Sequence, residues 1–310
     1  MSIVLTMSET KFHTSPEVAQ ALKSGAPIVA LESTIISHGL PRPSNLTVAR
    51  EVEEIVRAHG AVPATIAILD GVVHIGLTDE QLIEIANRDD IAKASSRDLA
   101  VIAATRKSAA TTVAATAHLA VLAGIHVFAT GGLGGVHRGA NESFDESADL
   151  TALSALDITV VCAGVKSILD VGATLERLET LAIGLVGYKT RAFPGFYLTD
   201  SGFTIEHQVE SAAEIASIIS QRVALKTNKS ALIIANPVAE EMNRVRHDAI
   251  LKSGLEGAAM NGITGKYVTP YLLEHFHTAS NGESLKVNIE IIKSNSALAA
   301  DIAVALSKKA

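Results

Sequence analysis

Short apolar runs alternate along the chain with longer amphipathic segments, and the two kinds have the lengths of strands and helices. Residues 125–129 and 158–165 are runs of β-branched and small apolar residues, typical of central parallel strands that are covered on both faces. Residues 27–31 have the same character. Residues 43–60 and 114–123 are typical of helices, and a glycine ends or follows each segment.

Local signals place further elements between these runs. Ser15, which a proline follows, is expected to cap one helix, and Thr78 is expected to begin another. Asp70 and Gly71 form a hairpin-type turn between the predicted strands 64–69 and 72–75. Further helices are predicted over residues 170–180, 210–224 and 284–306.

The alternation of these elements predicts an α/β protein, specifically a three-layer α/β/α sandwich with a mostly parallel central sheet. No internal repeat, charge block or low-complexity linker interrupts it, so we expect one domain over residues 1–310. The segment 188–202 is irregular and contains Phe193, Phe196 and Tyr197. It is interpreted as a lid or an interface arm, with a packed surface loop as the alternative.

Composition narrows the classes of function. Hydrophobic residues make up 48% of the chain and aromatic residues only 4%, so the core must be built from Ala, Val, Ile and Leu. A net charge of −7 argues against a general nucleic-acid-binding surface, although a free nucleotide needs only a local anion site. The single cysteine, Cys162, excludes an intrachain disulfide and suits a reducing compartment. No signal peptide or membrane span is visible, so we expect a cytoplasmic protein that binds neither a nucleic-acid polymer nor a membrane.

Lys166 is the residue most indicative of chemistry, because it directly follows the apolar run 158–165. Ligand crevices of open α/β sheets lie outside the carboxyl ends of the strands, so this lysine is expected to project into a site. A partly desolvated amine at such a place can act as a nucleophile or form a Schiff base. The alternative is an ordinary lysine whose stem lies along the strand end while its charge reaches solvent.

Residues 130–139 follow a short apolar strand and contain four glycines in five positions. Glycines let backbone amides approach a ligand closely and adopt positive φ angles. The segment matches neither the P-loop nor the dinucleotide-binding glycine pattern. His137 follows the glycines, and Asp145 and Asp149 come next, so together with Lys166 this region favours a catalytic centre over a tight turn.

Two further candidates lie near strand ends. Glu32 follows strand 27–31, where a partly apolar setting can raise the pKa of a carboxyl and make it a general acid; the alternative is a capping glutamate. Lys93 follows a short apolar stretch and by itself would be a surface lysine. Arg97 and Asp98 are expected to form an ion pair that shapes the same loop.

Two predicted helix starts are candidates for ligand binding. Thr112 precedes helix 114–123, and the free amides and positive dipole potential of a helix N-terminus favour phosphate; a plain threonine cap is the alternative, and both can hold. Asp145 and Asp149 are four residues apart and are expected to share a helix face. A lone carboxylate with several waters is typical of Mg²⁺ or Mn²⁺. For Asp145 the alternative is a helix N-terminal residue without a metal.

Beyond these signals, the chain resembles the pseudouridine-5′-phosphate glycosidase family, which includes the indigoidine-cluster protein A. The matching motifs cover nearly the whole chain in the family's order, at residues 30–39, 60–67, 128–139, 160–170, 184–188 and 235–237. The resemblance implies reversible cleavage of the C–C glycosidic bond of pseudouridine 5′-phosphate to uracil and ribose 5-phosphate, a lyase-type step of pseudouridine degradation. It also implies a divalent metal such as Mn²⁺ and a homotrimer, for which an exposed aromatic loop 193–197 would offer interface material.

The resemblance further implies roles for single residues. Glu32 matches the proton donor, Asp145 is assigned to the metal, and Lys166 is interpreted as the nucleophile that forms an imine with the ribose. The substrate phosphate is expected at Thr112 with help from Ser147. The expected substrate contacts are Lys93, Thr112, Val113, Thr130, His137, Ser147, Ala148, Asp149 and Asn288.

Two other classes of function stay open. A dinucleotide-binding oxidoreductase would explain the glycines, but the acidic residue expected at the end of the next strand is not evident. A non-catalytic nucleotide sensor would keep the pocket and lose the chemistry. The joint presence of Glu32, Lys93, Asp145 and Lys166 argues against a sensor.

Overall fold

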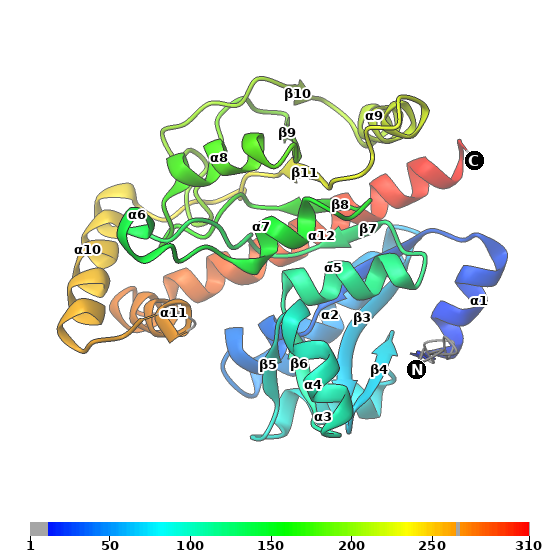
Figure 1. The fold of residues 1–310 in the computed structure, drawn as a ribbon, viewed down its shortest axis with the longest axis horizontal. Helices are drawn as coiled ribbons and strands as arrows, with labels where there is room; N and C mark the ends of the chain where they lie inside the picture. Colours follow the sequence, from blue (N-terminus) through cyan, green and yellow to red (C-terminus); the bar gives the residue numbers. More distant parts are fainter. Residues whose placement is uncertain (1–11, 265–266, 310) are drawn as a thin grey trace, which may run out of the picture.

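Strands and helices alternate along most of the chain in the computed structural model, which describes residues 12–264 and 267–309 (Figure 1). The strands are β1 (His13–Thr14), β2 (Ile28–Glu32), β3 (Val62–Leu69), β4 (Val72–Ile75), β5 (Ala92–Ala94), β6 (Ala109–Thr111), β7 (Val127–Ala129), β8 (Thr159–Cys162), β9 (Gly184–Tyr188), β10 (Gln208–Val209) and β11 (Leu232–Ala235). The helices are α1 (Pro16–Ser24), α2 (Ser44–Ala58), α3 (Asp79–Asn87), α4 (Leu99–Ala104), α5 (Val113–Leu122), α6 (Ala140–Ser143), α7 (Ala148–Leu153), α8 (Val171–Thr180), α9 (Ala212–Ala224), α10 (Arg244–Met260), α11 (Val268–Ala279) and α12 (Glu283–Ser307). A π-helical turn, η1 (Ile35–Gly39), follows β2, and a 3₁₀ turn, η2 (Ser96–Asp98), follows β5.

The strands form one sheet whose pairing is mostly parallel. Within the described residues it has eleven strands, with the order β1-β4-β3-β2-β7-β8-β11-β9-β10 and with β6 pairing both β3 and β5. The antiparallel pairings are those of β3 with β4 and of β3 with β6. The predicted α/β class with a mostly parallel sheet is therefore confirmed.

Helices cover both faces of this sheet and complete the three layers. α2, α9 and α12 pack on one face, and α1, α5, α7 and α8 pack on the other. In Figure 1, α12 runs across much of the molecule. Val160 of β8 belongs to one of these cores, and the next residue, Val161, belongs to the other. Because neighbouring side chains of a strand point to opposite faces, two covered faces require a continuous apolar run.

The local signals are confirmed with small shifts of the boundaries. The Ser15 hydroxyl accepts a hydrogen bond from the Val18 amide at the start of α1, and Thr78 forms a capping box with Gln81 at the start of α3. Asp70, at the turn between β3 and β4, has the positive φ angle that such a hairpin requires. The predicted strand 158–165 is shorter, since β8 ends at Cys162.

The expectation of an exposed aromatic loop at 193–197 is wrong. Phe193, Phe196 and Tyr197 are 0%, 3% and 2% exposed. The Tyr197 ring lies 5.2 Å from that of Phe276 on α11. These side chains form the core under α10 and α11, two helices at the left of Figure 1 that were not predicted from the sequence. Burial of such large apolar surfaces holds these helices against the end of the sheet.

Candidate active site

Three neighbouring strands end at one place, and a candidate residue ends or follows each. β2, β7 and β8 are adjacent and parallel, and their registers align their ends. Glu32 is the last residue of β2, Thr130 comes directly after β7, and Lys166 follows β8 after a short turn. The chain passes from β2 to β3 on one side and from β7 to β8 on the other, so the order reverses between β2 and β7. Ligand crevices of open α/β sheets form at such a point.

A cavity of about 270 Å³ opens at these strand ends. Its walls contain most of the candidates, namely Glu32, Lys93, Thr112, Val113, His137, Asp145, Ser147, Ala148, Asp149 and Lys166. An adjoining cavity of about 60 Å³ shares Glu32, Lys93 and Lys166 with it and extends to Asn288 on α12. Thr130 is fully buried and is not among the lining residues of either cavity.

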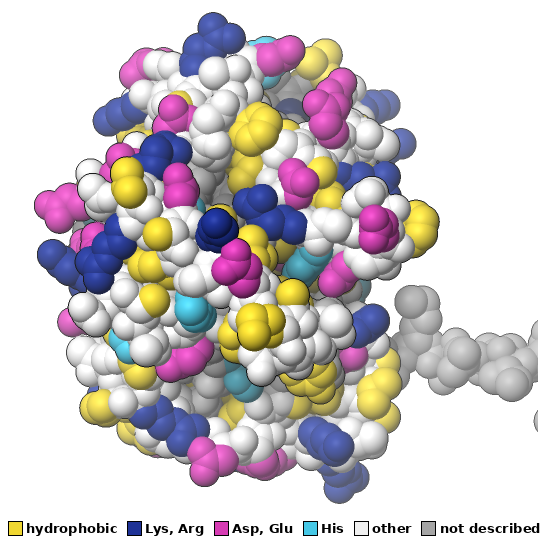
Figure 2. Space-filling model, turned by 90° about the vertical axis from the view of Figure 1, so that its left-hand side faces the viewer, with side chains coloured by type: hydrophobic (Ala, Val, Ile, Leu, Met, Phe, Trp, Pro, Cys, Tyr) yellow, Lys and Arg dark blue, Asp and Glu magenta, His cyan; other side chains and the backbone are white. Residues whose placement is uncertain are grey.

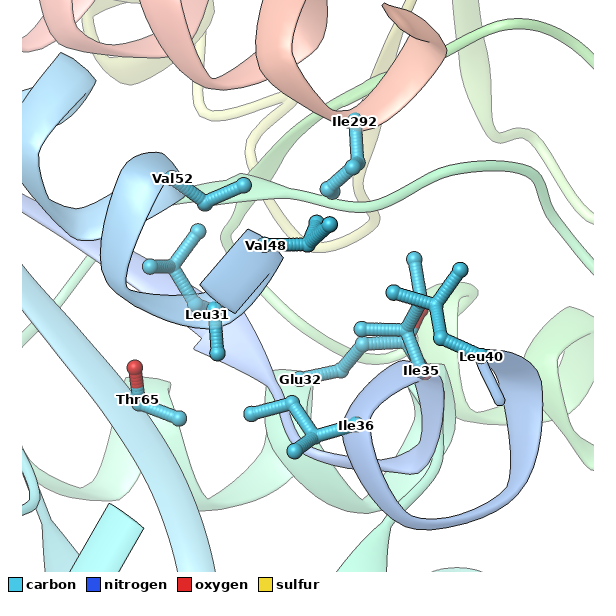
Figure 3. A pocket seen from close by; sticks show the side chains of 10 residues that line it. Leu31, Glu32, Ile35, Ile36, Leu40, Val48, Val52, Thr65 and Ile292 are labelled. Carbon is cyan, nitrogen blue, oxygen red and sulfur yellow. The ribbon is translucent and has the colours of Figure 1, made fainter. Parts of the chain in front are cut away.

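The Glu32 carboxyl combines one polar neighbour with apolar surroundings. The Thr130 hydroxyl donates a hydrogen bond to Oε1 of Glu32. A small cavity on another side of Glu32 is lined by apolar residues such as Ile35 and Val48 (Figure 3). Burial raises the pKa of Glu32, although the charge of Lys166 and the Thr130 hydrogen bond oppose this shift. A carboxyl with a raised pKa can keep a proton toward neutral pH and give it to a substrate.

Lys93 on β5 and Lys166 after β8 meet at the same cavity. No described side chain forms a hydrogen bond or an ion pair with either ammonium group. The Lys93 side chain is exposed to the open cavity. Desolvation by the surrounding protein nevertheless lowers the pKa of Lys93, and the charge of Lys166 lowers this pKa further. Glu32 and Asp149 act in the opposite direction. Two unpaired amines beside a carboxyl are suited to nucleophilic and acid–base chemistry.

The start of α5 has one free amide at the cavity wall. Thr112 caps the helix, and its hydroxyl accepts a hydrogen bond from the Ala115 amide, so the predicted cap is confirmed. The Ala114 amide donates to a carboxylate oxygen of Asp149 at 3.0 Å. The amide of Val113 has no acceptor within the described residues. This free amide and the helix dipole suit an anionic group.

The glycine-rich loop is shaped by close packing rather than by positive φ angles, which corrects the expectation for it. Gly131, Gly132, Gly134 and Gly135 all lie outside the positive-φ region. A Cβ atom on Gly134 would lie 2.2 Å from the Ser147 hydroxyl oxygen. A Cβ on Gly132 would lie 2.6 Å from the Phe196 ring, and one on Gly135 would lie 2.4 Å from the Thr174 hydroxyl oxygen. The glycines therefore let neighbouring side chains close around the site.

Asp145 stands before a helix and does not share a helix face with Asp149, which corrects that expectation. α7 begins at Ala148 with Ser147 as its cap. The Asp145 carboxylate is partly exposed and lies 3.8 Å from Nδ1 of His137. Desolvation lowers the pKa of His137 and the charge of Asp145 opposes that shift.

The fold brings further residues to the site that were not predicted from the sequence. Arg97 and Ser95 line the large cavity, and His38 lines the smaller one. The predicted pair of Arg97 and Asp98 is present at 3.8 Å, but the Arg97 side chain is 81% exposed. Leu273 lines the smaller cavity from α11, a helix that was not predicted from the sequence. His38 lies within the motif 30–39, which could have indicated it.

The surface and the helices add two observations. Figure 2 shows acidic and basic side chains interspersed on one face, with apolar side chains between them. In the part of the chain that the structure describes, no helix combines the length and the apolarity needed to cross a membrane.

Fold and site together define an α/β protein with a carboxyl and two lysines at the switch point of its sheet. Residues 17–305 match the family described as indigoidine synthase A like protein. The chain belongs to this family.

Several curated relatives are named pseudouridine-5′-phosphate glycosidase. The protein of that name from Salinispora tropica is 58% identical over 300 residues, which cover 96% of this chain and 93% of that protein. The one from Geobacillus kaustophilus is 50% identical over 295 residues, which cover 94% of this chain and 98% of that protein.

Two solved structures are also similar along nearly their whole length. The prealnumycin C-glycosynthase AlnA, solved in complex with ribulose 5-phosphate, has a TM-score of 0.89 and 33% identity, covering 96% of this chain and 97% of that one. An indigoidine synthase A-like protein from Thermotoga maritima has a TM-score of 0.88 and 36% identity, covering 99% of this chain and 100% of that one.

Proposed function

We propose that this chain cleaves the C–C glycosidic bond of pseudouridine 5′-phosphate to uracil and ribose 5-phosphate. The observation that carries the proposal is the meeting of Glu32 with Lys93 and Lys166 at one cavity. The Salinispora tropica relative of that name, at 58% identity, supports the choice of substrate. The leaving group departs through carbon, so the reaction needs both a proton donor and a covalent partner for the sugar.

In the proposed mechanism, the neutral Lys166 amine attacks C1′, and the C1′–O4′ bond breaks as O4′ takes up the proton that the attacking nitrogen gives up. The nitrogen lone pair then expels uracil by breaking the C1′–C5 bond, while Glu32 protonates C5. This step leaves a protonated lysine–ribose imine and an ionised Glu32. Water adds to C1′, and hydrolysis releases ribose 5-phosphate with the free amine and returns a proton to Glu32. Each step can run backwards, so the reaction is proposed to be reversible.

The substrate is proposed to lie across both cavities. The Val113 amide, Thr112 and Ser147 offer donors for the phosphate at the start of α5. Asn288 lines the smaller cavity, and we propose that it contacts the base or the phosphate. The remaining proposed contacts are His137 to the ribose or base, Lys93 as electrostatic support, Ala148 and Asp149 beside the phosphate, and Thr130 beside Glu32.

Mn²⁺ at Asp145 is proposed as the metal. The described residues hold no cluster of three or more His, Cys, Asp or Glu side chains able to bind a metal. Asp145 is partly exposed to the cavity, so this site fits a hydrated ion that is held by one carboxylate. When bound, such an ion supplies positive charge beside the phosphate and ribose.

A homotrimer and a cytoplasmic location are further proposals, and both rest on the family resemblance. Since Phe193, Phe196 and Tyr197 are buried, the subunit interface must use other residues. Sedimentation at micromolar concentration is expected to give the mass of three chains. The mass of one chain would exclude the trimer.

The proposed function is tested by measuring uracil release from pseudouridine 5′-phosphate with and without Mn²⁺. We expect release together with equimolar ribose 5-phosphate, and its reversal when both products are supplied. Titration with NAD(P) provides the comparison with an oxidoreductase. Absence of uracil release in the presence of Mn²⁺ would exclude the proposed reaction.

A further inference from the structure

A buried polar chain connects α12 to Glu32. Asn295 is 1% exposed, and its Nδ2 donates to the carbonyl oxygens of Thr130 at 2.7 Å and of Gly131 at 3.3 Å. Its Oδ1 accepts a hydrogen bond from Nδ2 of Asn236 at 2.9 Å. The hydroxyl of Thr130 in turn donates to Oε1 of Glu32. Asn236, Asn295, Thr130 and Glu32, which come from four distant parts of the sequence, thus form one continuous path.

The setting of Asn295 is unfavourable for a polar side chain, because the surrounding face of α12 is apolar. Ile291, Ile292, Leu298 and Ala299 are buried in the same helix. An amide buried among such side chains is disfavoured unless its hydrogen bonds are made. Both Nδ2 and Oδ1 of Asn295 form hydrogen bonds, so this buried amide has partners for its donor and its acceptor.

The hydrogen bonds from Asn295 hold the backbone where β7 ends. Thr130 has a single hydroxyl hydrogen, which it gives to Glu32, and the only hydrogen bond to its carbonyl oxygen in the described residues comes from Asn295. Hydrogen bonds to the carbonyls of Thr130 and Gly131 hold the backbone from which the Thr130 side chain reaches Glu32. Oε1 of Glu32 is then occupied as an acceptor, and a proton on this carboxyl is left on Oε2.

We propose that Asn295 is a positioning residue for the general acid. It holds Thr130, and Thr130 holds Oε1 of Glu32, so that the proton of Glu32 lies on Oε2. This inference rests on the proposed function, because it takes Glu32 as the proton donor.

The test compares Asn295→Leu, Thr130→Val, Thr130→Ser and the double variant Asn295→Leu/Thr130→Val. Turnover and KM for uracil release are measured against pH, and borohydride trapping with ribose 5-phosphate reports the intact sugar site. Misplacement of a reacting group can cost about 10²-fold, so we expect a loss of about 10- to 100-fold in kcat for Asn295→Leu, with KM and trapping unchanged. Loss of the hydroxyl donor should move the descending limb of the kcat profile to higher pH in Thr130→Val. Thr130→Ser keeps the hydroxyl donor, so its descending limb should lie at lower pH than that of Thr130→Val.

The double variant shows whether Asn295 acts through Thr130. The effects of substituting two residues that act through one another are not additive, so the loss of kcat in the double variant should match that in Thr130→Val alone. Asn295→Asp keeps the volume and the acceptor for Asn236, and it replaces Asn295→Leu if that variant does not fold. Ser296→Ala is the matched control, since this buried hydroxyl on the same helix has no partner in the described residues. It should behave as wild type.

Separate outcomes reject the two ideas. If wild type releases no uracil, the proposed function fails. If wild type is active and folded Asn295 variants keep its kcat and pH profile, the positioning role is wrong. Fully additive losses in the double variant would also overturn it.

Discussion

Asp149 ties the glycine-rich loop to a neighbouring helix through Gly134, whose amide donates to one carboxylate oxygen at 2.8 Å. The other oxygen accepts the amide of Ala114 in the first turn of α5 at 3.0 Å. The side chain is 6% exposed. Asp149 therefore sets the distance between two parts of the cavity wall, in addition to any contact with a ligand.

Replacing Asp149 with Asn should destabilise the chain, because the amide side chain offers one acceptor oxygen where two backbone amides need one each. An unpaired buried donor costs about 1–3 kcal/mol, so the free energy of unfolding should fall by about that amount. Urea denaturation measures it. Asp89→Asn is the control, since Asp89 forms an exposed ion pair with Arg42 that is worth at most about 1 kcal/mol. Equal midpoints for wild type and Asp149→Asn would contradict the structural role.

Glu32→Gln keeps the shape of the side chain and removes its acidic proton. We expect kcat for uracil release to fall by about 10²–10⁴-fold, the usual range for general acid catalysis, with little change in KM. Imine trapping with ribose 5-phosphate should survive, because it depends on Lys166. Turnover near that of wild type would assign the proton to another residue, with Lys93 as the first to test.

Comparing the pH dependence of stability between wild type and Glu32→Gln reports the pKa of Glu32 without an activity assay. Burial raises this pKa in the folded chain, so folding favours the protonated carboxyl. That contribution is complete below the unfolded pKa of about 4.3 and is lost as the pH rises through the raised folded value. Glutamine does not titrate, so wild type should lose stability relative to Glu32→Gln across this interval. Parallel stability curves would show that the pKa is not raised.

Lys166 is expected to be the residue that borohydride links to the sugar. Trapping should add the mass of reduced ribose phosphate to one peptide that contains Lys166. Lys166→Ala should lose activity and trapping, and Lys166→Arg should fail as well, because a guanidinium is not neutral at these pH values. Trapping at Lys93, whose pKa is lowered by desolvation and by the charge of Lys166, would exchange the two roles. An active Lys166→Ala without any adduct would exclude imine chemistry at this lysine.

Asp145→Ala should abolish the dependence on Mn²⁺ together with most of the turnover, since the proposed ion is held by this carboxylate. Activity titrated with Mn²⁺ after chelation measures the effect, and Mn²⁺ binding followed by electron paramagnetic resonance is a readout independent of turnover. Glu142→Ala is the control, because Glu142 is an exposed carboxylate in the same segment. Unchanged Mn²⁺ affinity in Asp145→Ala would remove it from the metal site.

The elements of the fold were largely determined by the sequence itself. Helix caps such as Thr78, the turn at Asp70 and continuous apolar strands are local signals, because each depends on a few neighbouring residues. The carboxyl ends of β2 and β8 were predicted only approximately, since β8 ends at Cys162 and not at Val165, but this was enough to place Glu32 and Lys166 at the crevice of the sheet.

The tertiary structure decided which distant residues meet. Strand order places Thr130 against Glu32, 98 positions earlier, and α12 brings Asn295 to Thr130, 165 positions later. No periodic pattern in the sequence indicates either contact, because each contact depends on which strands are neighbours and which helix covers them. The aromatic loop was misjudged for the same reason: Phe193 could be recognised as apolar from its neighbours in the sequence, but its burial depended on α10 and α11 folding over it.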